Sequence, residues 1–226
     1  MKVKSLLATA CALVCATSVQ AAEVSYNIGV VSLYKSSGVD QDADASGNAF
    51  GKAARPALQG GVDVDLGNGL YVGNWNSTGK FVDGSVEMDL YGGYAGELSG
   101  GMSYDVGYAH YFYPGYSDWN GGELYLSLSA GGFTAKVTNG LNTMKNQRRL
   151  ALSYDYSLTE QAGVNVTYGM RNQAKGGYND YAVGVSYDLG GDLSASATYS
   201  GATGASTADE RKGRKGRLVF GLSQGF

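Results

Sequence analysis

Apolar and polar residues alternate one by one through most of this sequence, in separate short segments. Successive side chains of a β-strand point to opposite faces, so this period of two predicts strands with one apolar and one polar face. Most segments are close to the ~9–11 residues with which a tilted strand crosses a bilayer. Twelve segments are predicted, at residues 24–34, 57–66, 69–77, 84–94, 100–113, 122–130, 133–139, 148–156, 162–171, 178–189, 193–200 and 217–226.

The connections between these segments alternate between short and long. The short ones are Gly67-Asn68, Ala95 to Ser99, Gly131-Gly132, Ser157 to Gln161 and Gly190 to Asp192, and the longer ones are 35–56, 78–83, 114–121, 140–147, 172–177 and 201–216. Transmembrane barrels have tight periplasmic turns and longer extracellular loops. We therefore predict an all-β fold, a transmembrane antiparallel up-and-down β-barrel of about 12 strands, with both mature ends in the periplasm of a Gram-negative bacterium.

The first residues carry a different pattern. Lys2 and Lys4 precede the short apolar stretch 6–14, and Val19-Gln20-Ala21 offers small residues where a signal peptidase cleaves. We expect residues 1–21 to be a cleaved signal peptide and residues 22–226 to form one outer-membrane barrel domain. Both cysteines lie in the leader, so the exported domain does not depend on disulfides. Loss of Lys2 and Lys4 changes the net charge from −3 to −5, which argues against a nucleic-acid partner.

Aromatic residues of the predicted apolar faces gather near the two strand ends. Tyrosine and tryptophan bury a ring while the polar tip stays wet, so such rows mark the two membrane interfaces. A general preference of sheets for tyrosine is the alternative, but it predicts no position along the strand. The short-turn row is Tyr26, Tyr71, Tyr94, Phe133, Tyr154, Tyr156, Tyr187 and Phe226, and the long-loop row is Tyr34, Trp75, Tyr108, Phe112, Tyr168, Tyr181 and Tyr199.

Lysine and arginine of the exported domain lie in or beside the long loops, except Lys136. A basic rim of this kind suits contact with outer-membrane lipid and lipopolysaccharide phosphates. The alternative is that long loops simply collect charged residues, as Asp40, Asp42 and Asp44 also do.

The last segment places Leu218, Phe220, Leu222 and Phe226 on one face and ends the chain on Phe226. This ending resembles the C-terminal signal read by the barrel-assembly machinery, with Phe220, Leu222 and Phe226 as its residues. Residues 56–115, PALQGGVDVDLGNGLYVGNWNS and then GSVEMDLYGGYAGELSGGMSYDVGYAHYFYPG, resemble the TorF family of porins. The family often has an aromatic-Arg-Gly-Ile-Ser-Gln stretch after its first strand, where this chain has residues 35–41 without the arginine and the aromatic. The resemblance implies an outer-membrane, porin-like protein and supplies no substrate.

Catalytic chemistry finds little support. The single histidine, His110, shares its face with the apolar Val106 and Tyr108, so we expect it at the lipid interface beside no particular serine. The pairs Asp63/Asp65 and Glu87/Asp89 could act as acid and base or bind a cation, but such pairs are more often solvated lumenal residues. We predict no enzyme, no metal and no cofactor.

Positions opposite the apolar faces are mostly glycine, serine, asparagine and charged residues. Twelve strands enclose more space than eight, so small residues such as Gly93 and Gly107 should leave a narrow path. The predicted pore-lining residues are acidic on one wall and basic on the other, namely Asp63, Asp65, Glu87, Asp89, Asp105, Glu123, Lys136, Arg149 and Arg171. We expect passive diffusion of small hydrophilic solutes with mild cation preference. The alternative is a closed structural or adhesion barrel whose charges pair inside. Whether the 35–56 loop narrows the pore stays open.

Overall fold

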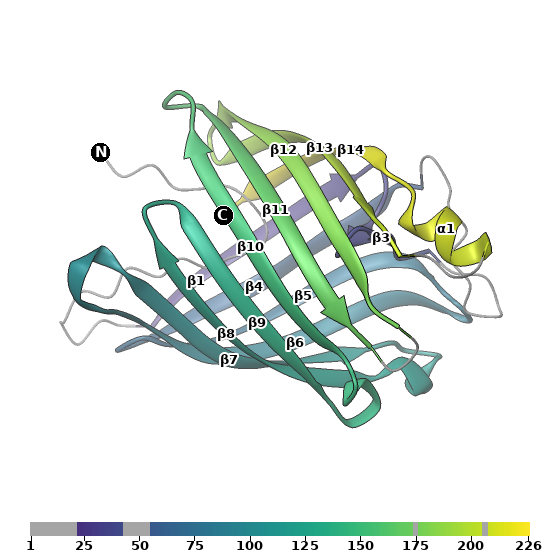
Figure 1. The fold of residues 1–226 in the computed structure, drawn as a ribbon. Helices are drawn as coiled ribbons and strands as arrows, with labels where there is room; N and C mark the ends of the chain where they lie inside the picture. The colour runs from purple at the N-terminus through teal and green to yellow at the C-terminus, as the bar shows by residue number, and fades with distance from the viewer. Residues whose placement is uncertain (1–21, 43–54, 174–175, 205–207) are drawn as a thin grey trace.

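Twelve antiparallel strands close into a single barrel (Figure 1). The structure is a computed structural model that describes residues 22–42, 55–173, 176–204 and 208–226. The predicted signal peptide and residues 43–54 lie outside the described residues. The barrel strands are β1 (Glu23–Val31), β4 (Ala57–Gly67), β5 (Leu70–Phe81), β6 (Gly84–Glu97), β7 (Ser103–Phe112), β8 (Gly121–Ala130), β9 (Phe133–Leu141), β10 (Arg148–Ser157), β11 (Ala162–Asn172), β12 (Tyr178–Gly190), β13 (Leu193–Ala202) and β14 (Arg217–Gly225).

The pairing of first and last strands leaves the barrel without an open edge. Val30 of β1 opposes Leu222 of β14 on one side and Leu58 of β4 on the other. Phe226 donates its backbone N–H to the Tyr26 carbonyl at 2.9 Å, next to that seam. In a closed barrel each strand pairs its backbone N–H and C=O groups with a neighbour on both sides. A structure in the hydrocarbon interior of a membrane must pair its backbone groups in this way. The predicted fold class, an all-β barrel of about 12 strands, is confirmed.

The predicted alternation sets which face of each strand points outward. Leu90, Leu126 and Leu152 are each about half exposed, at 51%, 47% and 47%, although they lie in the middle of well-paired strands. Their sequence neighbours carry the polar side chains of the inner face. An apolar outer face and a polar inner face are the pattern of transmembrane barrels.

The short turns at one end of the barrel contain glycine and asparagine residues with positive φ angles. Gly131 and Gly132 join β8 to β9 with φ angles of +56° and +87°, and Asn68 joins β4 to β5 with φ of +54°. Glycine and asparagine tolerate the left-handed region that two-residue hairpin turns need. Both ends of the described chain lie at this end of the barrel.

Strand β5 has the opposite facing from the one predicted. Tyr71 and Trp75 point into the barrel, while Asn74 and Asn76 face outward and hydrogen-bond each other at 2.5 Å. A register shift between Asp65 and Gly67 accompanies the turn before β5. The interface positions predicted for Tyr71 and Trp75 were therefore wrong. The outward asparagines satisfy each other and the Asp89 backbone carbonyl, and this pairing lowers the cost of placing amides on that face.

The long connections carry small elements of their own. They hold the hairpin β2 (Lys35–Ser36) and β3 (Val39–Asp40), the 3-10 turns η2 (Ser117–Trp119) and η3 (Asn142–Met144), and helix α1 (Ala208–Arg214), whereas η1 (Ser99–Gly101) lies in a short turn. None of the helices in the described parts of the chain has the length and apolar character to cross a membrane. Figure 1 shows β3 inside the outline of the barrel, toward the end that carries α1.

Candidate functional site

Contacts that pass over an intervening strand identify the inner face of the barrel. The Tyr71 hydroxyl of β5 donates to Asp105 of β7 at 2.5 Å and also contacts the Tyr125 hydroxyl of β8. The Tyr91 hydroxyl of β6 donates to Asp63 of β4 at 2.5 Å. Tyr71 and Tyr125 are only 5% and 8% exposed, whereas residues on the opposite faces of their strands, such as Val72 and Leu126, are about half exposed, so these contacts lie on the lumenal side. The structure therefore places Asp63 and Asp105 on the inner face, as the predicted alternation requires.

Tyrosine rings fill part of the space that glycines leave. A Cβ on Gly93 would collide with the Tyr71 hydroxyl, and a Cβ on Gly107 with the Tyr125 hydroxyl. The predicted glycine-lined path is thus wrong at these two positions, because the sequence-based facing of Tyr71 put its ring outside. Lys136 lies 4.3 Å from the centre of the Tyr125 ring. Lys136 therefore sits beside the acidic wall rather than opposite it.

Three carboxylates form the acidic wall nearer the long loops. Asp89 lies close enough to Glu87 and Glu123 for their charges to act on it. Glu87 is 4% exposed, and one of its oxygens and one of Asp89's are buried without a hydrogen-bond partner. Glu123 accepts a hydrogen bond from the Tyr111 hydroxyl at 2.9 Å. Among the described residues, no lysine or arginine forms an ion pair with any of the three.

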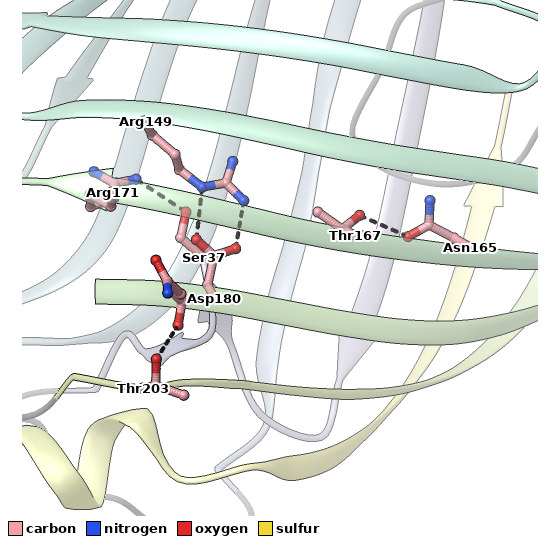
Figure 2. A network of polar contacts seen from close by, with 8 residues as sticks. Ser37, Arg149, Asn165, Thr167, Arg171, Asp180 and Thr203 are labelled. Atoms are coloured by element: carbon pink, nitrogen blue, oxygen red, sulfur yellow. Dashed lines mark hydrogen bonds and ion pairs between the residues drawn. The ribbon is translucent and has the colours of Figure 1, made fainter. Parts of the chain in front are cut away.

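The basic wall is partly neutralised by an aspartate that the sequence reasoning missed. Arg149 of β10 binds Asp180 of β12 through two hydrogen bonds, of 2.9 and 2.6 Å (Figure 2). Asp180 is 2% exposed, so the pair is a bidentate contact in a buried setting. Asp180 occupies an inward position of segment 178–189, and its parity alone could have identified it. Gly169 lies between them and has no side chain to separate the pair.

Arg171 connects the wall to the first long loop. Its guanidinium donates to the Ser37 hydroxyl at 3.1 Å (Figure 2). It also donates to the Gln147 side-chain oxygen at 3.0 Å. On the other side of the barrel, the Tyr34 ring packs on Trp75 with centroids 5.5 Å apart. The long-loop interface position predicted for Tyr34 was therefore wrong.

The β2–β3 hairpin spans the mouth of the barrel at its long-loop end, called the outer mouth below. Tyr34, just before it, contacts β5, and Ser37 at its tip contacts β11. These two strands lie opposite each other in the ring of twelve. Leu33 is 1% exposed, so the start of the loop is held firmly. Residues 35–42 of the 35–56 loop thus narrow the lumen at this end.

Buried charged side chains hold the β2–β3 hairpin in place, but their removal from water costs free energy. The Lys35 ammonium pairs with Asp40 at 2.5 Å and reaches the backbone carbonyls of Gly213 and Lys215. Burial raises the pKa of Asp40 despite this pairing, and burial lowers the pKa of Lys35. Burial also raises the pKa of Asp42, which accepts the Lys80 backbone N–H at 2.9 Å. Removal of these charges from water opposes docking of the loop.

Acidification is expected to strengthen docking of this loop. A carboxyl whose pKa is raised in the docked state binds its proton more tightly there. Protonation of Asp40 and Asp42 therefore favours docking as the pH falls from about 7 to about 4. The groups facing them are Lys35, Arg55 and Arg217. Ion conductance of the reconstituted barrel should fall over this range, and Asp42→Asn should weaken the fall. An identical pH profile in that variant would remove Asp42 from the effect.

The remaining predicted residues have local roles or lie elsewhere. Asp65 accepts the Gly67 backbone N–H at 2.7 Å and so supports the turn that follows β4. His110 lies on the outer face, where its Nδ1 is 2.8 Å from the Tyr108 hydroxyl and its ring is 4.3 Å from that of Phe112. Phe220, Leu222 and Phe226 also face outward, at 57%, 45% and 73% exposure.

Comparison with known proteins adds the family. The matching family model covers residues 15–224 and describes a bacterial protein of unknown function, Gcw_chp. The chain belongs to the Gcw_chp family. No curated protein sequence matches this Gcw_chp chain.

Solved structures show what the Gcw_chp barrel resembles. The KdgM porin is 10% identical with a TM-score of 0.61, over 90% of this chain and 98% of that one. The same values hold for that porin in complex with disordered oligogalacturonate. The NanC porin is 11% identical with a TM-score of 0.57, over 89% of this chain and 98% of that one. At such identity the likeness is one of fold.

Proposed function

We propose that this protein is a narrow, porin-like outer-membrane channel through which small hydrophilic solutes diffuse passively, with a mild preference for cations. The observation that carries the proposal is the unbalanced charge of the lumen. Glu87, Asp89 and Glu123 form no ion pair among the described residues, whereas Arg149 is paired with Asp180. A negative lining with low-dielectric walls attracts cations and repels anions.

Two resemblances support a channel and leave its solute open. Residues 56–115 are similar to TorF-family porins, and the barrel is similar to those of KdgM and NanC. The oligogalacturonate in one KdgM structure is a polyanion. The acidic wall formed by Glu87, Asp89 and Glu123 opposes such a ligand, so we infer a solute of opposite or no charge for this chain.

The outer surface supports the proposed location. Exposed aromatic side chains such as Tyr156 and Phe133 lie near the short turns, and Tyr199 and Tyr168 near the long loops, as interfacial girdles do. We infer that both mature ends are periplasmic and that basic loop residues contact lipopolysaccharide. The outward-facing C-terminal residues, Phe226 among them, are then available to the barrel-assembly machinery. The proposal includes no catalysis, cofactor or nucleic acid.

A closed structural or adhesion barrel is the second candidate. The network of Tyr71, Tyr125 and Asp105 occupies the lumen, and the β2–β3 hairpin spans its outer mouth. Reconstitution in planar bilayers separates the two candidates. Discrete conductance steps support the channel, and a folded, inserted protein that gives none leaves the structural candidate.

Neutralising the acidic wall is expected to reduce cation selectivity. The double variant Glu87→Gln/Asp89→Asn removes two lumenal charges, so the cation-to-anion permeability ratio should move toward unity. The reversal potential in a salt gradient measures this ratio. The exposed Glu160→Gln, in a short turn outside the lumen, removes one charge and should leave the potential unchanged. An unaltered potential in the double variant would exclude both carboxylates from the selectivity filter.

A further inference from the structure

The acidic wall lies beside a pair of aromatic rings. Trp75 faces the lumen directly across from Asp89 on the neighbouring strand. The Tyr34 ring packs on Trp75 at 5.5 Å with an angle of 59°, so the two rings form a bent surface rather than a flat stack. The Tyr34 hydroxyl also hydrogen-bonds Glu87. These side chains come from the first long loop and strands β5 and β6, and meet where the loop enters the barrel.

Glu87 is a buried carboxylate that lacks a full set of hydrogen-bond partners, and this points to a ligand. It is 4% exposed, and its second oxygen is buried without a partner, although Tyr34 and Tyr113 hydrogen-bond the carboxylate. One buried oxygen of Asp89 is likewise unpartnered. Buried polar atoms are normally satisfied, and a buried carboxylate is normally paired with a cation. Within the described residues neither carboxylate forms an ion pair.

The type of cation follows from the surroundings. No group of three or more histidine, cysteine, aspartate or glutamate side chains among the described residues is placed to hold a metal ion. Aromatic faces, in contrast, attract organic cations, and tryptophan does so best. Two carboxylates beside a tryptophan and a tyrosine therefore match an ammonium or guanidinium group better than a metal ion.

We propose that Tyr34, Trp75, Glu87 and Asp89 form a binding site for the ammonium or guanidinium end of a small organic cation at the lumenal constriction. The carboxylates neutralise the charge and accept its hydrogen bonds, and the two rings contact its apolar part. The inference rests on the proposed channel function and names the class of solute that it would favour. The site lies beside the hairpin that narrows the mouth, so a bound solute would occupy the constriction.

Binding can be measured without any transport. The chain contains only two tryptophans, Trp75 and Trp119, so in the Trp119→Phe variant fluorescence reports Trp75 alone. Agmatine, which carries both an ammonium and a guanidinium group, is titrated into the folded protein in detergent, with calorimetry in parallel. We expect saturable binding that shifts Trp75 fluorescence. Urea, a neutral analogue of guanidinium, should give no saturation.

Variants identify the groups responsible. Glu87→Gln and Asp89→Asn should each weaken agmatine binding about tenfold or more, as expected for loss of a charge-assisted contact. Trp75→Leu, measured by calorimetry, should weaken it about two- to thirtyfold, and Trp75→Phe less, because a ring remains. The surface variant Glu160→Gln should bind as the parent does. Heat-dependent gel mobility confirms that each variant is folded.

The outcomes separate this inference from the channel itself. Three results would overturn the binding site: no saturable agmatine binding, agmatine binding by Glu87→Gln and Asp89→Asn as tight as the parent's, or Mg²⁺ binding at the same site as tight as agmatine's. Conductance of the same preparation tests the channel independently. A conducting protein that does not bind agmatine keeps the channel and loses the site. A protein that binds agmatine and conducts nothing keeps the site and loses the channel.

Discussion

Valine in place of Gly38 is expected to release the β2–β3 hairpin from the outer mouth and to raise single-channel conductance several-fold. Gly38 has φ of +72°, and a Cβ there would overlap the Gly201 backbone carbonyl of β13. A side chain in the left-handed region costs ~1–2 kcal/mol, and overlap with backbone adds to it. One or two kcal/mol changes the ratio of docked to released hairpin by about 5–30-fold. Planar-bilayer recording measures the change directly.

Gly100 provides the matched control for this variant. It has φ of +78°, with nothing within 4 Å of an added Cβ, and lies in a turn at the opposite end of the barrel. Gly100→Val carries similar backbone strain without touching the hairpin, so its conductance should match the parent's. The acid-induced fall in conductance should also disappear in Gly38→Val alone. If Gly38→Val conducts like Gly100→Val, the hairpin does not limit the flow of ions.

The strand pattern made the barrel predictable because it is a local property of the sequence. In segment 148–156, Leu150, Leu152 and Tyr154 alternate with Ala151 and Ser153, and the structure gives them the expected opposite faces. Each strand shows this alternation on its own. A predicted strand boundary that is wrong by a few residues therefore does not change the predicted number of strands or the prediction that they close into a barrel. Short turns such as Gly131-Gly132 added a second local signal.

Strand β5 shows where the local pattern fails. Tyr71 and Trp75 are as suited to an interface girdle as to a lumen, because each has an apolar ring and a polar group. The decision rests on distant residues. Gly93 on β6 makes room for the Tyr71 ring, and Asp105 on β7 accepts its hydroxyl proton. Neither contact can be predicted from the sequence of β5 alone.

The candidate site depends even more on distant contacts. The sequence places Glu87 and Asp89 on an inner face, yet it gives no sign that Tyr34 folds back onto Trp75. Similarly, Arg149 was predicted as a lumenal cation, while its partner Asp180, 31 residues away, was not recognised. Loop conformation and ion pairs between strands depend on how the closed barrel brings distant segments together. The alternation of residues within one strand does not predict these contacts.

Arginine in place of Leu152 is expected to cost ~2–4 kcal/mol in the free energy of unfolding, the range for a cationic side chain facing lipid near the bilayer midplane. Leu152 lies in the middle of β10, is 47% exposed, and is flanked on its face by Ala135 and Tyr168 of the neighbouring strands. Urea unfolding from lipid vesicles, followed by tryptophan fluorescence, gives the change. Heat-dependent gel mobility should show less folded barrel at assembly.

Ser153→Arg tests the same substitution one residue further along the strand. Ser153 faces the lumen between Thr134 and Thr167, where water can solvate the new charge. Its free energy of unfolding should therefore stay within about 0.5 kcal/mol of the parent's, the usual range for exposed positions. The difference between the two variants measures the solvent on each side of β10. Equal stability would mean that the apolar face does not meet lipid, and the channel proposal would fall with it.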